Sequence, residues 1–166
     1  MNRSHCLKFS LTLLLLCLMA VATRAEEEVK QIPEKEITAL QIELEEATKS
    51  TSSARQKLAI RRVIRSCEEL LANNEKASNR FAILGVLFSS QQKLIGLDNS
   101  ALNRRSFLET CRLLADAPNE YAAIRLDADL LLSQSQLAQQ GADAKTRAAA
   151  LPPLIDRYRN TEVESK

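Results

Sequence analysis

Apolar and polar positions recur at helical spacing along most of the chain, and the stretch from Asn119 to Gly141 shows this most clearly. Its two apolar sectors contain Tyr121, Ile124, Ala128, Leu131, Leu132 and Ala138 on one side and Ala123, Leu126, Leu130 and Leu137 on the other. The polar strip between them consists of Arg125, Asp129, Ser133, Gln136 and Gln140. We expect this strip to be solvated, with Arg125 and Asp129 paired one turn apart. A helix with two apolar faces needs a neighbour on each side.

The same spacing predicts further helices, each bounded by residues that start or stop a helix. The first begins at Pro33 and ends before the polar segment 49–53, which is either a loop or a solvated helical turn. The next three are predicted from Ala54 to Asn73, from about Asn79 to Leu94, and from a cap within Asp98–Ser100 to Pro118. Gly141 then ends the Asn119 helix as a left-handed cap, and Asp143 begins a last helix that Pro152 and Pro153 kink or split near Leu151.

Residues 1–25 have the pattern of a cleavable secretory signal peptide. Arg3 and Lys8 give a positive start, and the apolar run that follows is shorter than the ~20 residues of a membrane-spanning helix. We expect cleavage after Ala25, export to the periplasm or the extracellular space, and no membrane span afterwards; an uncleaved anchor is the alternative. Residues 26–53 are then an acidic, mobile lead-in with the first helix, and residues 54–166 a helical-repeat domain.

Removal of the leader changes the charge balance. The full chain has 23 Lys and Arg against 21 Asp and Glu, and the leader carries Arg3, Lys8 and Arg24 but no acidic residue. The remaining chain is close to neutral, so its bulk charge gives no support for a nucleic-acid partner, and we expect none. Only 3 glycines occur, and residues that favour helices dominate. The composition therefore predicts one all-α domain.

Segments of the chain repeat at an interval that suits two helices per unit. Arg61-Arg62-x-Ile64 aligns with Arg104-Arg105-x-Phe107, and Asn79-x-Phe81-Ala82 aligns with Asn119-x-Tyr121-Ala122. Units of two helices predict antiparallel hairpins stacked as a short solenoid or an irregular bundle. The alternative is chance similarity between helices rich in Leu and Arg.

Phe81-x-x-Leu84-Gly85-x-x-Phe88 resembles the first helix of a tetratricopeptide repeat, and Pro118-Asn119 resembles the junction that closes one. The resemblance covers about residues 79–166. It implies a stack of hairpins that binds other proteins, with close approach of a neighbouring helix at Gly85. The spacing of the copies exceeds the family's period of about 34 residues, and Arg125 stands where the second copy would have Gly. The family's ligand groove therefore does not transfer residue by residue.

The end of the chain has the form of a helix start. Thr161-Glu162-Val163-Glu164 matches a capping box, and we expect a helix to follow in a longer protein; a frayed terminus is the alternative. The chain also resembles the helical heads of secreted bacterial proteins that precede a thioredoxin-like domain. That resemblance implies an alternative function, the head of an exported enzyme whose catalytic domain lies beyond Lys166.

Cys67 and Cys111 are the only cysteines after the leader, and both lie on apolar helix faces. Stacked hairpins would make their helices neighbours, and an exported protein meets an oxidising environment. We therefore favour one structural disulfide over two buried thiols, with a stabilisation on the order of 4 kcal/mol. No Cys-x-x-Cys motif is present, so a redox role is not indicated.

Catalytic and metal-binding devices are not predicted. The single histidine, His5, lies in the leader, which excludes Ser-His-Asp and Cys-His catalysis and His-ligated zinc from the remaining chain. Gly85, Gly96 and Gly141 are too far apart for a phosphate-binding loop. We expect no catalytic residue, no cofactor and no metal.

One exposed feature is a candidate binding site. A candidate basic stripe combines two repeat-equivalent helices and consists of Arg61, Arg62, Arg65, Arg104, Arg105 and Arg112. It would suit an acidic protein, polysaccharide or lipid headgroup. The interpretation that we favour is a solvated face neutralised locally, for example by an ion pair between Arg65 and Glu69. The sequence as a whole favours an exported, non-catalytic scaffold that binds a protein of the cell envelope.

Overall fold

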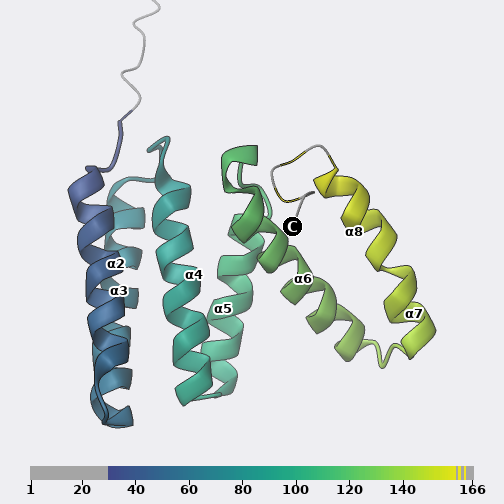
Figure 1. The fold of residues 1–166 in the computed structure, drawn as a ribbon, viewed down its shortest axis with the longest axis horizontal. Coiled ribbons are helices and arrows are strands. Elements are labelled where there is room, and N and C mark those ends of the chain that lie inside the picture. Colours follow the sequence, from purple (N-terminus) through teal and green to yellow (C-terminus); the bar gives the residue numbers. More distant parts are fainter. Residues whose placement is uncertain (1–29, 160, 162, 164–166) are drawn as a thin grey trace, which may run out of the picture. The chain divides into compact units, whose positions relative to one another are not determined.

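The computed structural model describes residues 30–159, 161 and 163, and every regular element within them is a helix (Figure 1). The all-α class predicted from the sequence is therefore confirmed for this part of the chain. The predicted signal peptide, the acidic start of the lead-in and two residues of the 161–164 capping box lie outside the described residues. From Gln31 onward, the described residues belong to one compact unit.

Two pairs of helices form the first part of this unit. α2 (Glu34–Lys49) and α3 (Ser53–Asn73) are joined by a short loop, which settles the open question at residues 49–53, and α4 (Arg80–Leu97) is followed by α5 (Ala101–Leu114). α4 packs against α2, α3 and α5 and so occupies the centre of this part (Figure 1). Its side chains are apolar nearly all round, as expected for a helix with neighbours on several sides.

The main hydrophobic core lies between these four helices. The largest side chains that are fully buried in it are Ile32, Ile60, Ile83, Leu84 and Leu114. The buried face of α2 consists of Ile37, Leu40, Leu44 and Ala47. α2 thus belongs to the same core as α3 and α4.

The second part begins with the 3-10 helix η1 (Asn119–Tyr121) and α6 (Ala122–Gln139). α6 packs against α5 on one side and against the short helices α7 (Ala144–Ala149) and α8 (Leu151–Tyr158) on the other (Figure 1). The prediction that this helix has a neighbour on each flank is confirmed. The first apolar sector meets the main core through Ile124, Ala128, Leu131 and Leu132.

The ends of these helices follow the local signals in the sequence. The Ser100 hydroxyl caps α5 by accepting a hydrogen bond from the backbone N–H of Asn103 at 3.2 Å. Gly141 has a φ of +63° after α6, and the amide of Ala142 donates to the Leu137 carbonyl at 2.9 Å, which completes a Schellman cap. Asp143 caps α7, and α7 gives way to α8 at Leu151, immediately before the two prolines.

The segment before α2 is fixed by one side chain of the second pair. The side-chain Oδ1 atom of Asn79 accepts a hydrogen bond from the Ile32 backbone N–H at 2.9 Å, and its Nδ2 atom donates one to the Ile32 carbonyl at 2.8 Å. The Ile32 side chain is fully buried. The entry to α2 is therefore attached to the start of α4.

Candidate binding surfaces

A buried polar network fixes α8 against α6. The Tyr158 hydroxyl donates to the Asp129 carboxylate at 2.6 Å, and the Arg157 guanidinium pairs with the same carboxylate at 3.0 Å. Arg125 donates to the Ala117 carbonyl and lies over the Tyr158 ring, with its Cζ atom 5.1 Å from the ring centroid.

This network corrects the prediction of a fully solvated strip on α6. Both residues are buried, since only 9% of the surface of Arg125 and 6% of that of Asp129 is accessible to solvent. The predicted ion pair between them is replaced by contacts to α8 and to the α5–α6 junction. The exposed positions of the strip are Gln136 and Gln140. Buried charges need partners; α8 supplies those of Asp129, and the α5–α6 junction supplies the hydrogen-bond acceptors of Arg125. Burial and the hydrogen bond to Asp129 also raise the pKa of Tyr158 to about 12.

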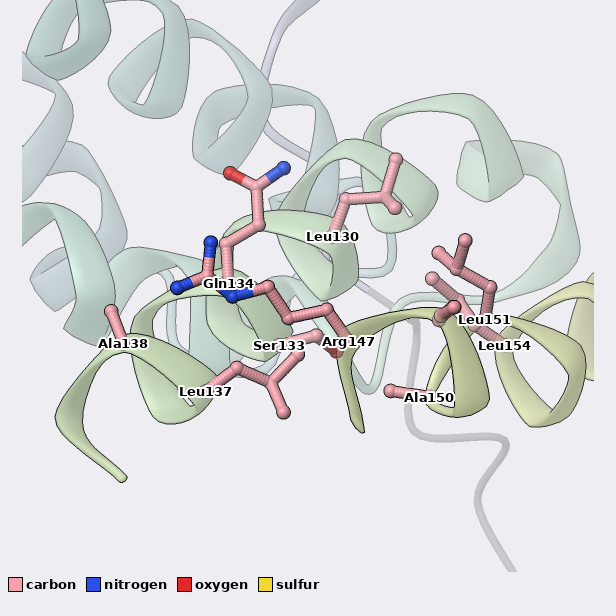
Figure 2. Close-up of a pocket in the computed structure, with 10 residues that line it drawn as sticks. Leu130, Ser133, Gln134, Leu137, Ala138, Arg147, Ala150, Leu151 and Leu154 are labelled. Carbon is pink, nitrogen blue, oxygen red and sulfur yellow. The ribbon is translucent and has the colours of Figure 1, made fainter. Parts of the chain in front are cut away.

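An apolar groove separates α6 from α7 and α8 for much of their length. One hollow of about 580 Å³ is lined by Leu130, Ser133, Gln134, Leu137, Ala138, Arg147, Ala148, Ala150, Leu151 and Leu154 (Figure 2). A second hollow, of about 310 Å³, continues it towards Tyr158 and Val163, and the two share Leu130, Leu151 and Leu154. We call these two hollows together the α6–α8 groove. The second apolar sector of α6 therefore lines an open surface as well as contacting its neighbours.

Polar groups occur at the margin of the α6–α8 groove. Arg147 extends from α7 towards α6 (Figure 2), and its Nε donates to the Ala142 carbonyl at 3.0 Å. Gln134 and Ser133 lie on α6 in the same hollow. At the other end, Arg159 pairs with Asp156 at 2.8 Å. The arrangement is an aliphatic floor with charged and amide groups along its edges, which is the usual composition of a site for an amphipathic ligand.

The structure divides the candidate basic stripe into separate sites. The guanidinium of Arg61 pairs with Asp98 at 2.7 Å. Arg62 and Arg65 are exposed on α3, and the described residues contain no ion pair between Arg65 and Glu69.

Arg104, Arg105 and Arg112 come together on α5, in a hollow of about 280 Å³ that also includes Ala101, Leu108 and Gln139 of α6. We call it the α5 arginine hollow. Three of the six arginines thus form one cluster on α5, and the three on α3 lie outside that cluster.

Cys67 on α3 and Cys111 on α5 are free cysteines, and both are fully buried. The favoured disulfide between them is not formed in this structure. Burial is the main reason that the pKa of each thiol rises to about 12. Neither thiol is therefore placed for nucleophilic chemistry.

A third surface crosses α2, α4 and the start of α6. A shallow groove of about 670 Å³ includes Gln41, Leu44, Lys93, Tyr121 and other residues around Gly85. A Cβ atom on Gly85 would lie 3.2 Å from the Ile124 Cδ1 atom. The close helix approach expected at Gly85 is thus present, and α6 provides the neighbour.

The feature that sequence analysis missed is the coupling of Asp129 to Tyr158. Helical periodicity assigned Asp129 to a polar strip because it considers one helix at a time. A buried partner 29 residues away in the sequence is not visible to that method. The available signal was Tyr158 itself, an aromatic residue whose hydroxyl group needs a hydrogen-bond partner when it is buried.

Within the described residues, no helix is both long and apolar enough to cross a membrane, and no three His, Cys, Asp or Glu side chains are grouped as metal ligands. In comparisons with known proteins, the chain matches no family model, no curated protein and no solved structure.

Proposed function

We propose that this protein is an exported, non-catalytic scaffold that binds an amphipathic helix of a partner protein in the α6–α8 groove. The observation that carries the proposal is the continuous aliphatic lining contributed by α6 on one wall and by α8 on the other. Apolar grooves between helices are a recurring site for partner helices.

Two side chains of α8 support this proposal because they are exposed at the groove. Leu151 and Ile155 lie one helical turn apart, and 49% and 63% of their surfaces are exposed. Apolar side chains aligned along one groove are typical anchors for an interface, whereas isolated ones are ordinary surface. Along α6 the groove extends from Leu126 to Ala138, a rise of roughly 18 Å that corresponds to about three turns of a bound helix.

Site-specific photocrosslinking tests the proposal. A photoreactive amino acid placed at position 151 or 155 is expected to give one discrete adduct with the same protein in the native cells. Leu58 on α3 is the matched control, since it is an exposed leucine (66%) outside the groove. The partner identified in this way is then purified and titrated against the unmodified chain.

The Leu151→Gln/Ile155→Gln variant is expected to weaken that affinity by about tenfold or more, because two apolar anchors would be lost. Leu58→Gln is expected to bind normally. The absence of adducts at positions 151 and 155, equal adducts at position 58, or unchanged affinity of the double variant would each contradict the proposal.

A further inference from the structure

The α5 arginine hollow concentrates positive charge without an acidic residue in its lining. Its residues come from one face of α5 and, opposite, from the last residue of α6: Ala101, Arg104, Arg105, Leu108, Arg112 and Gln139. Three arginines therefore line a hollow of about 280 Å³ together with one glutamine and two apolar residues.

The three arginines differ in how they are held. Arg104 donates from Nη1 to the Asn99 carbonyl at 3.1 Å and to the Asn99 Oδ1 atom at 3.0 Å, which orients its guanidinium. Arg105 and Arg112 form no hydrogen bond or ion pair with any other residue that the structure describes. Arg61 and Arg157, in contrast, each pair with a buried or half-buried carboxylate.

The distribution of charge along α5 indicates the kind of anion that would bind. Arg105 and Arg112 are separated by two helical turns, a rise of about 10 Å. This separation suits a chain with several carboxylates better than one small anion. Guanidinium groups bind carboxylates through paired N–H donors, and Gln139 offers a further neutral donor on the opposite wall.

We infer that the α5 arginine hollow binds an acidic peptide segment through its carboxylates. This inference goes beyond the proposed function, because none of these residues lines the α6–α8 groove. The two sites flank the last turn of α6, where Ala138 lines the groove and Gln139 lines the hollow. Each can therefore be altered without changing the other.

A labelled glutamate-rich peptide provides the test. Its binding to the full chain is followed by fluorescence anisotropy at low and at physiological ionic strength, and heteronuclear NMR locates the contact. The test variant is Arg105→Gln/Arg112→Gln. The control variant is Arg62→Gln/Arg65→Gln, which removes the same charge from exposed positions of α3. Circular dichroism confirms that both variants are folded.

The test variant is expected to weaken peptide binding by about tenfold, as the loss of two exposed ion pairs predicts. The control is expected to change it by less than about twofold, because distant charges are screened. Equal weakening by both variants would overturn the inference by showing that only net charge matters. Failure of the peptide to bind, or equally tight binding of inorganic phosphate with the same dependence on arginine, would overturn the assignment of an acidic peptide.

Discussion

At the scale of single residues, Arg125, Asp129 and Tyr158 show where local reading of a sequence fails. The spacing placed the first two correctly on one strip of α6, but the strip is half buried because α8 returns to cover it. A periodicity argument counts polar residues as exposed unless a partner is known. The partner here depends on how the chain folds back after Gly141, which is a property of tertiary structure.

Replacement of Tyr158 by phenylalanine tests the contribution of this network. Tyr158→Phe leaves the Arg157–Asp129 pair in place but removes a buried hydrogen bond to a carboxylate. The free energy of unfolding is expected to fall by about 1.5 kcal/mol, measured by urea denaturation. Tyr121→Phe is the matched control, since its hydroxyl makes no hydrogen bond with a described residue, and it should change stability by less than about 0.5 kcal/mol. Equal effects of the two substitutions would contradict a specific role for Tyr158.

The thiols of Cys67 and Cys111 allow a second prediction at this scale. Because burial raises both pKa values to about 12, neither thiol should react with an alkylating reagent at neutral pH while the protein is folded. After denaturation without reductant, both cysteines should be alkylated, as peptide mass mapping would detect. Alkylation that requires prior reduction would instead support the disulfide favoured by the sequence and count against the free thiols of the structure.

At the scale of elements, the helix boundaries were largely predictable because their signals are local. Start and stop signals act on backbone groups within a few residues, so the sequence alone locates each helix terminus. These signals are Pro33, Ser100, Gly141 and Asp143. The third predicted helix extends three residues further than expected, since α4 continues through Gly96 to Leu97. A glycine within a helix lowers its stability but does not by itself end it.

Gly96 and Gly141 should respond oppositely to the same substitution. An added Cβ at Gly96 would meet no atom within 4 Å, and this position is inside α4. Gly96→Ala is therefore expected to raise the free energy of unfolding by about 0.5–1 kcal/mol. Gly141→Ala is expected to lower it by about 1 kcal/mol, because its φ of +63° disfavours a side chain. Thermal or urea denaturation of the two variants measures both changes, and a shift of the same sign in both would contradict the assigned backbone roles.

At the scale of the described unit, the hydrophobic core is unevenly divided. The main cluster joins α2 to α5 and the inner flank of α6, whereas the second cluster is small and is formed around Ala122, Tyr158 and Val163. The sequence predicted that helices cover both flanks of α6. It could not show that one flank is covered loosely, because that difference comes from the short lengths of α7 and α8 and from the angle at which the chain returns after Gly141. The α6–α8 groove results from this looser cover.

Hydrogen exchange should reveal the same division. Amides of α7 and α8 are expected to exchange faster than those of α3 and α4, because segments with fewer buried contacts open at lower free energy. Mass spectrometry of peptic fragments would measure this difference. Tyr158→Phe should accelerate exchange in α8 while leaving α3 unchanged. Uniform protection across all helices would show instead that the unit opens as one cooperative body.

The double hydrogen bond between Asn79 and Ile32 has a mechanical consequence. A force applied to the chain before Ile32 would act on the start of α4 through these two hydrogen bonds. They would have to break before α2 could detach from its neighbours. Asn79→Ala would remove this transfer, so α2 would detach at lower load in a single-molecule pulling experiment. The Asn79 side chain would thus distribute a load applied before α2 between α2 and α4, whereas without it α2 alone would bear that load.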